Sequence, residues 1–124
     1  MKKIFIISIL FLNSCSLLRE NGIEIRIENN TNQPINNIKC YTSERLETIE
    51  MKTIQPNKKI SKFLSMKNNT QDGSYILEYF NSDNKKIIKK EGYYSNGASF
   101  NQWIQYTIKE DTVLVKLSKS NISY

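Results

Sequence analysis

Strict alternation of apolar and polar residues is the feature that most restricts how this chain can fold. In "IEIRIE", residues 23–28, three isoleucines alternate with three charged residues. Successive side chains on a β-strand point to opposite faces, so this pattern predicts a strand with one buried and one exposed face. No segment carries an apolar 3.6-residue period over three turns, and we therefore expect no long amphipathic helix.

Further short segments of strand character follow at roughly 8 to 14 residue spacing. They cover residues 35–42, 45–54, 60–66, 74–80, 87–88, 100–108 and 113–117. Turn-forming sequences such as "NNTNQP" at 29–34 and "KNNTQDG" at 67–73 separate them. The sequence therefore predicts an all-β fold, a small immunoglobulin-like or transthyretin-like β-sandwich of about seven or eight antiparallel strands.

The first residues follow a different pattern. Met1 is followed by two lysines and then by an apolar run, residues 4–12, that is interrupted only by Ser8. As a helix this run would rise about 14 Å, roughly half of a ~30 Å hydrocarbon core. A short positive start followed by a short apolar stretch is the layout of a removable export signal, and a buried N-terminal strand is the alternative.

The residues that end this run resemble the lipobox of bacterial lipoproteins. The sequence there is Leu12-Asn13-Ser14-Cys15. The resemblance implies cleavage before Cys15 and lipid on its thiol, so that Cys15 becomes the membrane-anchored N-terminus. Because Ser16 is not the Asp that retains many such proteins at the inner membrane, it also implies an outer-membrane protein of the cell envelope that faces the periplasm.

The expected organisation is a signal peptide at 1–14, a lipid-anchored tether at 15–22, a β-sandwich domain at 23–118 and a C-terminal tail at 119–124. Removal of the signal takes away Lys2 and Lys3 from a chain whose formal net charge is +6. The mature chain is then mildly basic and its lysines are scattered, so we expect no nucleic-acid partner. The sequence leaves the oligomeric state open.

The residue types needed for common catalytic sites are scarce. The chain contains no histidine, which removes Ser-His-Asp and Cys-His catalysis and most zinc sites. With Cys15 lipidated, Cys40 has no partner for a disulfide, and we expect it to be a buried thiol. We expect no enzyme, cofactor or metal; Glu24, Glu28 and Glu78 are the carboxylates from which a less favoured hydrolase could be built.

Aromatic residues supply the candidate binding site. In "GYYSNGASFNQW", residues 92–103, Tyr93 and Tyr94 lie in a glycine-bounded stretch and Trp103 lies on the polar face of its strand. Exposed aromatic rings stack on sugars or anchor protein interfaces. Tyr93, Tyr94 and Trp103 are therefore the predicted contacts with an envelope protein or a glycan, and the alternative is that these rings belong to the core.

Two short resemblances complete the sequence analysis. The stretch 92–103, with "DTVL" at 111–114, is similar to the end of small lipoprotein lysozyme inhibitors, which implies an inhibitor or immunity protein as the alternative function. Asp111-Thr112-Val113 resembles the acceptor for O-glycosylation of exported bacterial proteins, which implies a glycan on Thr112.

Overall fold

The fold is described from a computed structural model, which covers residues 20–120. These residues form nine strands and no helix. The strands are β1 (Gly22–Asn29), β2 (Ile35–Thr42), β3 (Thr48–Ile54), β4 (Lys59–Ser65), β5 (Gly73–Phe80), β6 (Lys86–Ser95), β7 (Ala98–Ser99), β8 (Trp103–Ile108) and β9 (Val113–Leu117). The predicted all-β class is confirmed, with nine strands in place of seven or eight.

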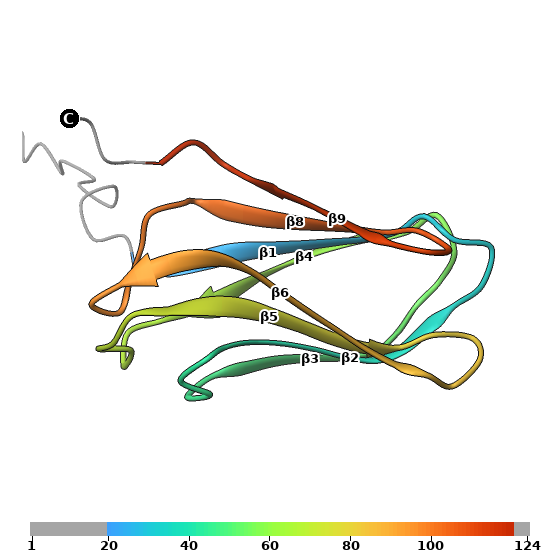
Figure 1. The fold of residues 1–124 in the computed structure, drawn as a ribbon, viewed down its shortest axis with the longest axis horizontal. Coiled ribbons are helices and arrows are strands. Elements are labelled where there is room, and N and C mark those ends of the chain that lie inside the picture. Colours follow the sequence, from blue (N-terminus) through green and yellow to red (C-terminus); the bar gives the residue numbers. More distant parts are fainter. Residues whose placement is uncertain (1–19, 121–124) are drawn as a thin grey trace, which may run out of the picture.

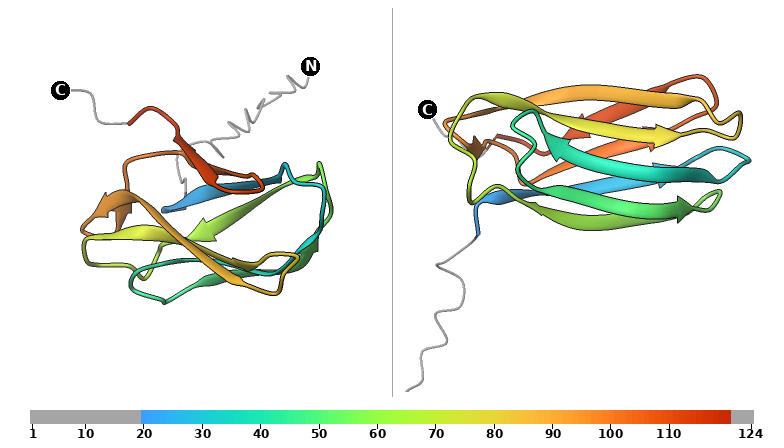
Figure 2. Two further views of the ribbon diagram at one scale, coloured as in Figure 1. Left: turned by 45° about the vertical axis from the view of Figure 1, so that its right-hand side comes forward. Right: turned by 90° about the horizontal axis from the view of Figure 1, so that it is seen from below.

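The strands form two stacked sheets (Figure 1). The four-stranded sheet has the order β4-β1-β8-β9, and the five-stranded sheet has the order β3-β2-β5-β6-β7. Figure 2 shows the two layers from other sides, with β3 beside β4 along one edge of the sandwich. The predicted β-sandwich is confirmed.

One strand pair departs from the prediction that all strands are antiparallel. β1 and β8 run parallel, with a register from Glu24 opposite Trp103 to Asn29 opposite Ile108. All other pairs in both sheets are antiparallel. The alternation of a strand determines which residues face the core but carries no information about the neighbouring strand, and so the sequence could not predict this pair.

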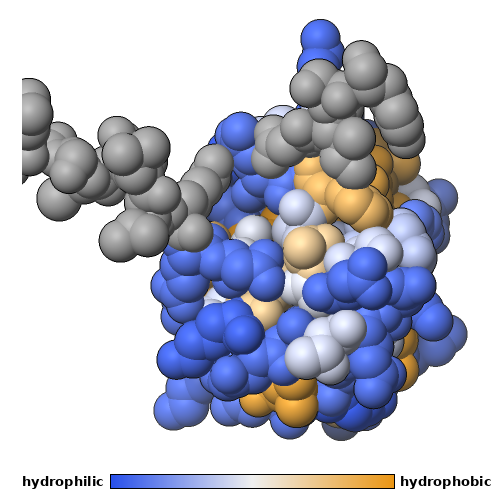
Figure 3. Space-filling model, turned by 90° about the vertical axis from the view of Figure 1, so that its left-hand side faces the viewer, coloured by the Kyte–Doolittle hydropathy of each residue, from blue (hydrophilic) through white to orange (hydrophobic). Residues whose placement is uncertain are grey.

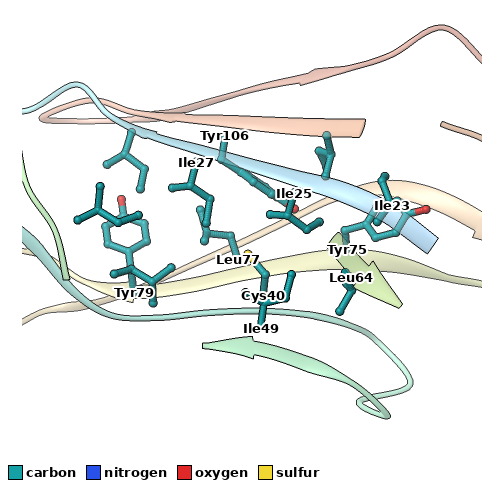
Figure 4. Packing of buried hydrophobic residues seen from close by; sticks show 14 of the residues in the cluster. Ile23, Ile25, Ile27, Cys40, Ile49, Leu64, Tyr75, Leu77, Tyr79 and Tyr106 are labelled. Atoms are coloured by element: carbon teal, nitrogen blue, oxygen red, sulfur yellow. The ribbon is translucent and has the colours of Figure 1, made fainter. Parts of the chain in front are cut away.

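The core lies between the sheets and consists of their inward-facing residues (Figure 4). Ile23, Ile25 and Ile27 of β1, Tyr75, Leu77 and Tyr79 of β5, and Ile104, Tyr106 and Ile108 of β8 are all buried. The predicted buried face of residues 23–28 is therefore confirmed. Cys40 is a buried free thiol, as expected, and burial raises its pKa, which keeps it protonated.

The domain begins slightly earlier than expected. The side-chain amide of Asn21 donates hydrogen bonds to the carbonyl of Met66 at 3.0 Å and to that of Gly97 at 2.7 Å. Asn21 and Gly22 thus belong to the folded domain and not to the predicted tether. The start of β1 and the end of β9 lie at one end of the sandwich, which we call the entry end (Figure 2). The predicted signal peptide and Cys15 lie outside the described residues.

Candidate functional site

Tyr93 is exposed, as its prediction as a contact residue requires. It lies near the end of β6 with 52% of its surface exposed. Its ring stacks on Phe100, with the ring centres 5.9 Å apart and the planes inclined by 29°. Tyr93 is therefore a surface residue at the entry end, partly held in place by a second aromatic ring.

Tyr94 is not a surface residue, and its prediction as a contact is wrong. Its side chain is completely buried, and its ring centre lies 5.6 Å from that of Tyr75. Its hydroxyl donates a hydrogen bond of 2.8 Å to the Glu44 carboxylate and accepts one of 3.4 Å from the Asn69 amide. A loop that projects Tyr93 and Tyr94 together, the arrangement that would favour an inhibitor, is absent from the described residues.

A β-bulge explains the position of Tyr94. Between the pair Tyr75–Glu91 and the pair Gly73–Tyr94, β6 contains one residue more than β5. Gly92 lies at this point with φ +78°, a conformation that residues with a Cβ rarely adopt. The extra residue shifts the alternation of β6, so Tyr94 turns into the core and Tyr93 turns outward.

Trp103 lies on the outer face of the four-stranded sheet, as its polar strand face predicted. Glu24 of β1 pairs with Trp103 of β8 on one side and with Phe63 of β4 on the other. Phe63 is 44% exposed and Trp103 is half-buried. We call the surface formed by Phe63, Glu24, Arg26 and Trp103 the aromatic face.

Arg26 connects the charged and aromatic parts of this face. Its guanidinium carbon lies 4.4 Å from the centre of the Trp103 ring, a cation–π contact. Its Nε and Nη2 donate to the two carboxylate oxygens of Glu24 at 3.0 and 3.2 Å. The hydrogen bonds from Arg26 and from the Ser61 hydroxyl lower the pKa of Glu24, so Glu24 is ionised at neutral pH.

Of the carboxylates considered for a hydrolase, Glu24 and Glu28 share the outer face of β1, and neither faces Glu78. Glu24 lies on the outer face of the four-stranded sheet, whereas Glu78 lies on the outer face of the five-stranded sheet. Glu78 accepts hydrogen bonds from Lys86 Nζ at 2.8 Å and from the Tyr41 hydroxyl at 2.7 Å. These contacts lower its pKa, whereas a general acid requires a raised one.

Thr112 is exposed in the turn between β8 and β9, where a glycan would be accessible. Its carbonyl accepts a hydrogen bond of 2.8 Å from the Lys109 amide. Thr112 also lines a hollow of about 410 Å³ at the end of the sandwich opposite the entry end. Ile87, Ile108 and Val113 form part of the apolar lining of this hollow. The glycan on Thr112 stays a prediction.

The described residues contain no group of three or more histidine, cysteine or acidic side chains that could hold a metal ion. They also contain no helix long and apolar enough to cross a membrane.

Local patterns carried partial signals for Glu24, Arg26 and Phe63, the members of the aromatic face that were not predicted as contacts. The alternation of residues 23–28 turns Glu24 and Arg26 away from the core, and Phe63 is out of phase with the buried residues of its strand. The order β4-β1-β8 brings these residues next to Trp103. That order depends on pairing between distant segments, which the local pattern does not contain.

Comparisons with known proteins extend the description of the fold only. No protein-family model matches the chain, and no curated protein matches it. A solved structure, the NMR structure of a protein from Eubacterium rectale, is similar with a TM-score of 0.56 and 14% sequence identity. The similarity covers 83% of this chain and 94% of that protein, and at this identity it supports the sandwich fold alone.

Proposed function

We propose that this protein is a lipid-anchored bacterial envelope protein that acts by binding another protein through its aromatic face. The lipid anchor on Cys15 is inferred from the lipobox resemblance. Two acyl chains or more give stable attachment at about 0.8 kcal/mol per buried CH₂. Ser16, in place of the Asp that retains many lipoproteins at the inner membrane, supports an outer-membrane protein that faces the periplasm.

The surface of the entry end is compatible with attachment by lipid. Apart from the part covered by grey atoms, this end is mostly hydrophilic, and its apolar patches are separated by hydrophilic residues (Figure 3). The part of this face that is not covered by grey atoms shows no broad apolar area with which to enter a bilayer (Figure 3). This supports attachment by lipid over insertion of this face.

The arrangement of Trp103, Arg26 and Phe63 on one sheet face carries the binding proposal. Tryptophan and arginine are enriched among the residues that contribute most to the binding energy of protein interfaces. Such residues cluster near the centre of the interface, where packing is tight and water is excluded. A sugar site would need an open ring plane for stacking, whereas Arg26 covers the Trp103 ring. We therefore favour a protein over a glycan as the partner.

The anchor is tested by the mass of the membrane-extracted protein and by detergent partitioning. The wild-type chain should begin at Cys15, carry acyl mass and enter the detergent phase. Cys15→Ser should lose the acyl mass and leave that phase. A wild-type chain that is unmodified, or that partitions into water, would contradict the lipid anchor. The binding proposal would then depend on the cross-linking experiment alone.

The binding surface is tested by a photo-crosslinking amino acid at position 63, in cells that make the full-length chain. We expect one discrete heterologous product that disappears when Trp103→Ala is added. The same probe at Ile88, which is 58% exposed on the outer face of the other sheet, is the matched control and should give no such product. Trp103-dependent co-sedimentation with purified peptidoglycan, without a protein product, would instead make the ligand a glycan.

A further inference from the structure

Strand β9 is a free sheet edge. In the part of the chain that the structure describes, β9 is hydrogen-bonded to β8 alone. The backbone carbonyl of Thr112 accepts from the Lys109 amide, and the backbone amide of Ser118 donates to the Trp103 carbonyl at 3.0 Å. Because hydrogen-bonding directions alternate along a strand, the amides and carbonyls of Val113, Val115 and Leu117 point away from β8.

The other edges carry features that oppose strand addition. Lys62 of β4 pairs with the buried Ile25 and so lies on the inward face of an edge strand. Among the described residues, β7 pairs only with Tyr94 and Ser95, so the rest of β6 is also an edge, and its Lys89 and Glu91 lie on the inward face as an ion pair of 3.2 Å. β3 is in contact with β4 along the closed side of the sandwich. Inward-pointing charges and covered edges are ways in which proteins prevent further pairing.

β9 has none of these features. Its sequence is VLVKL, and its inward-facing residues are all aliphatic. Leu117 faces inward yet is 39% exposed, and Leu114 on the outer face is 46% exposed. β9 can therefore form backbone hydrogen bonds with one more strand, and that strand could cover Leu114 and Leu117 with apolar side chains.

We propose that β9 pairs antiparallel with β9 of a second copy of this chain, with the two-fold axis at Val115. This register places Val113 opposite Leu117 of the second copy on the inner face. On the outer face it places Leu114 beside Lys116, so no like charges meet. The three outward residues of each strand would exchange about six hydrogen bonds, and the two four-stranded sheets would become continuous.

A second copy fits this edge because the strand is complementary to itself. A two-fold interface uses the same patch twice, and two-fold dimers are the commonest symmetric oligomers. The aromatic face lies on the outer surface of the sheet and would remain open in this dimer. The inference therefore does not depend on the proposed function.

Cysteine cross-linking of the full-length chain in cells tests the register. A Val115→Cys side chain would lie opposite its copy at about 5 Å between Cβ atoms. A Leu117→Cys side chain would lie about 14 Å from its copy along antiparallel strands. A thiol cross-linker with a reach of about 8 Å should therefore give roughly tenfold more dimer from Val115→Cys than from Leu117→Cys. The wild-type chain is the control for any reaction of Cys15 or Cys40 and should give as little dimer as Leu117→Cys.

A proline variant tests the pairing without a cross-linker. The Val115 amide points away from β8, so Val115→Pro should keep the β8–β9 ladder and the fold, as proline does on edge strands. The detergent-solubilised wild-type chain should sediment as a dimer and Val115→Pro as a folded monomer. The backbone amides of Val113, Val115 and Leu117 should exchange slowly in the wild-type dimer.

The proposal would be overturned by a monomeric wild-type chain at tens of micromolar, by equal cross-linking at positions 115 and 117, or by rapid exchange of the three outward amides. If Val115→Pro does not fold, the cross-linking and exchange results on folded chains decide the question. A cross-link from position 115 to a different protein only would also overturn it.

Discussion

At the scale of single residues, adjacent side chains with the same chemistry have different roles. Tyr93 and Tyr94 differ in burial because of the bulge at Gly92, and only Tyr94 is part of the core. The hydroxyl of Tyr94 is hydrogen-bonded to Glu44 and to Asn69, which lie in the turns at the entry end. A buried hydroxyl that connects two turns contributes to stability, whereas an exposed one on the same strand contributes little.

Removal of the Tyr94 hydroxyl should therefore destabilise the fold. We expect Tyr94→Phe to lower the free energy of unfolding by about 1 kcal/mol, the usual net contribution of a buried hydrogen bond. Tyr93→Phe is the matched control and should change it by less than about 0.5 kcal/mol. Urea unfolding of the two variants provides the measurement, and equal effects would mean that the Tyr94 hydroxyl is not a stabilising contact.

The ion pair of Glu78 should make stability depend on pH. Contacts with Lys86 and Tyr41 lower the pKa of Glu78 in the folded state. Its contribution is therefore fully present above the unfolded pKa of about 4.3 and is lost as the pH falls through the lower folded value. Glu78→Gln should flatten the decrease in the urea midpoint between about pH 5 and pH 3.

Glu50→Gln is the control for this pH dependence. Glu50 lies on the same outer face as Glu78, but its side chain is exposed and its carboxylate is 3.9 Å from Lys39 Nζ. Exposed pairs of this length contribute little to stability. A loss of slope as large in Glu50→Gln as in Glu78→Gln would argue that the general charge of the face, and not the Glu78 contacts, sets the pH dependence.

At the scale of elements, the β6 bulge depends on one glycine. Gly92 has φ +78°, and an added Cβ would lie 2.8 Å from Cδ2 of the Tyr75 ring. We expect Gly92→Ala to cost about 2 kcal/mol, since a left-handed conformation alone costs 1–2 kcal/mol in a residue with a Cβ. In a domain of this size such a loss would lower the midpoint of thermal unfolding by roughly 10 °C.

Asn84→Gly, in the turn between β5 and β6, is the control for Gly92→Ala. Asn84 also has a positive φ, 56°, which glycine adopts without strain. We expect its thermal midpoint to stay within a few degrees of wild type. If Gly92→Ala were equally harmless, the bulge would have to adapt to a Cβ without cost.

For the strands, the sequence predicted which side chains are buried better than it predicted which strands are neighbours. Alternation in residues 23–28 correctly predicted which side chains are buried, because burial on one face is a local property of a strand. The same reasoning failed at Tyr94, where one extra residue reverses the faces. It could not predict the aromatic face as a unit, because Phe63, Arg26 and Trp103 meet only through pairing between β4, β1 and β8.

At the scale of the whole molecule, the parallel β1–β8 pair joins the beginning of the domain to its end. β8 supplies Ile104, Tyr106 and Ile108 to the core and lies between β1 and β9 in the four-stranded sheet. Without β8, β1 would keep only β4 as a partner, and the core would lose the three buried side chains that β8 contributes. The fold should therefore become complete only when the chain up to β9 is present.

Two C-terminal truncations test this dependence. A chain that ends at residue 120 keeps all nine strands and the Ser118 hydroxyl, which accepts hydrogen bonds from the backbone amides of Gln102 and Trp103. It should unfold in one cooperative urea transition close to that of the full chain. A chain that ends at residue 102 lacks β8 and β9 and should show no cooperative transition. Removal of three large buried side chains, at 2–5 kcal/mol each, costs about 6–15 kcal/mol, which is as large as the 5–15 kcal/mol by which small domains are stable. Cooperative unfolding of the shorter chain would show that the five-stranded sheet is stable without the β1–β8 pair.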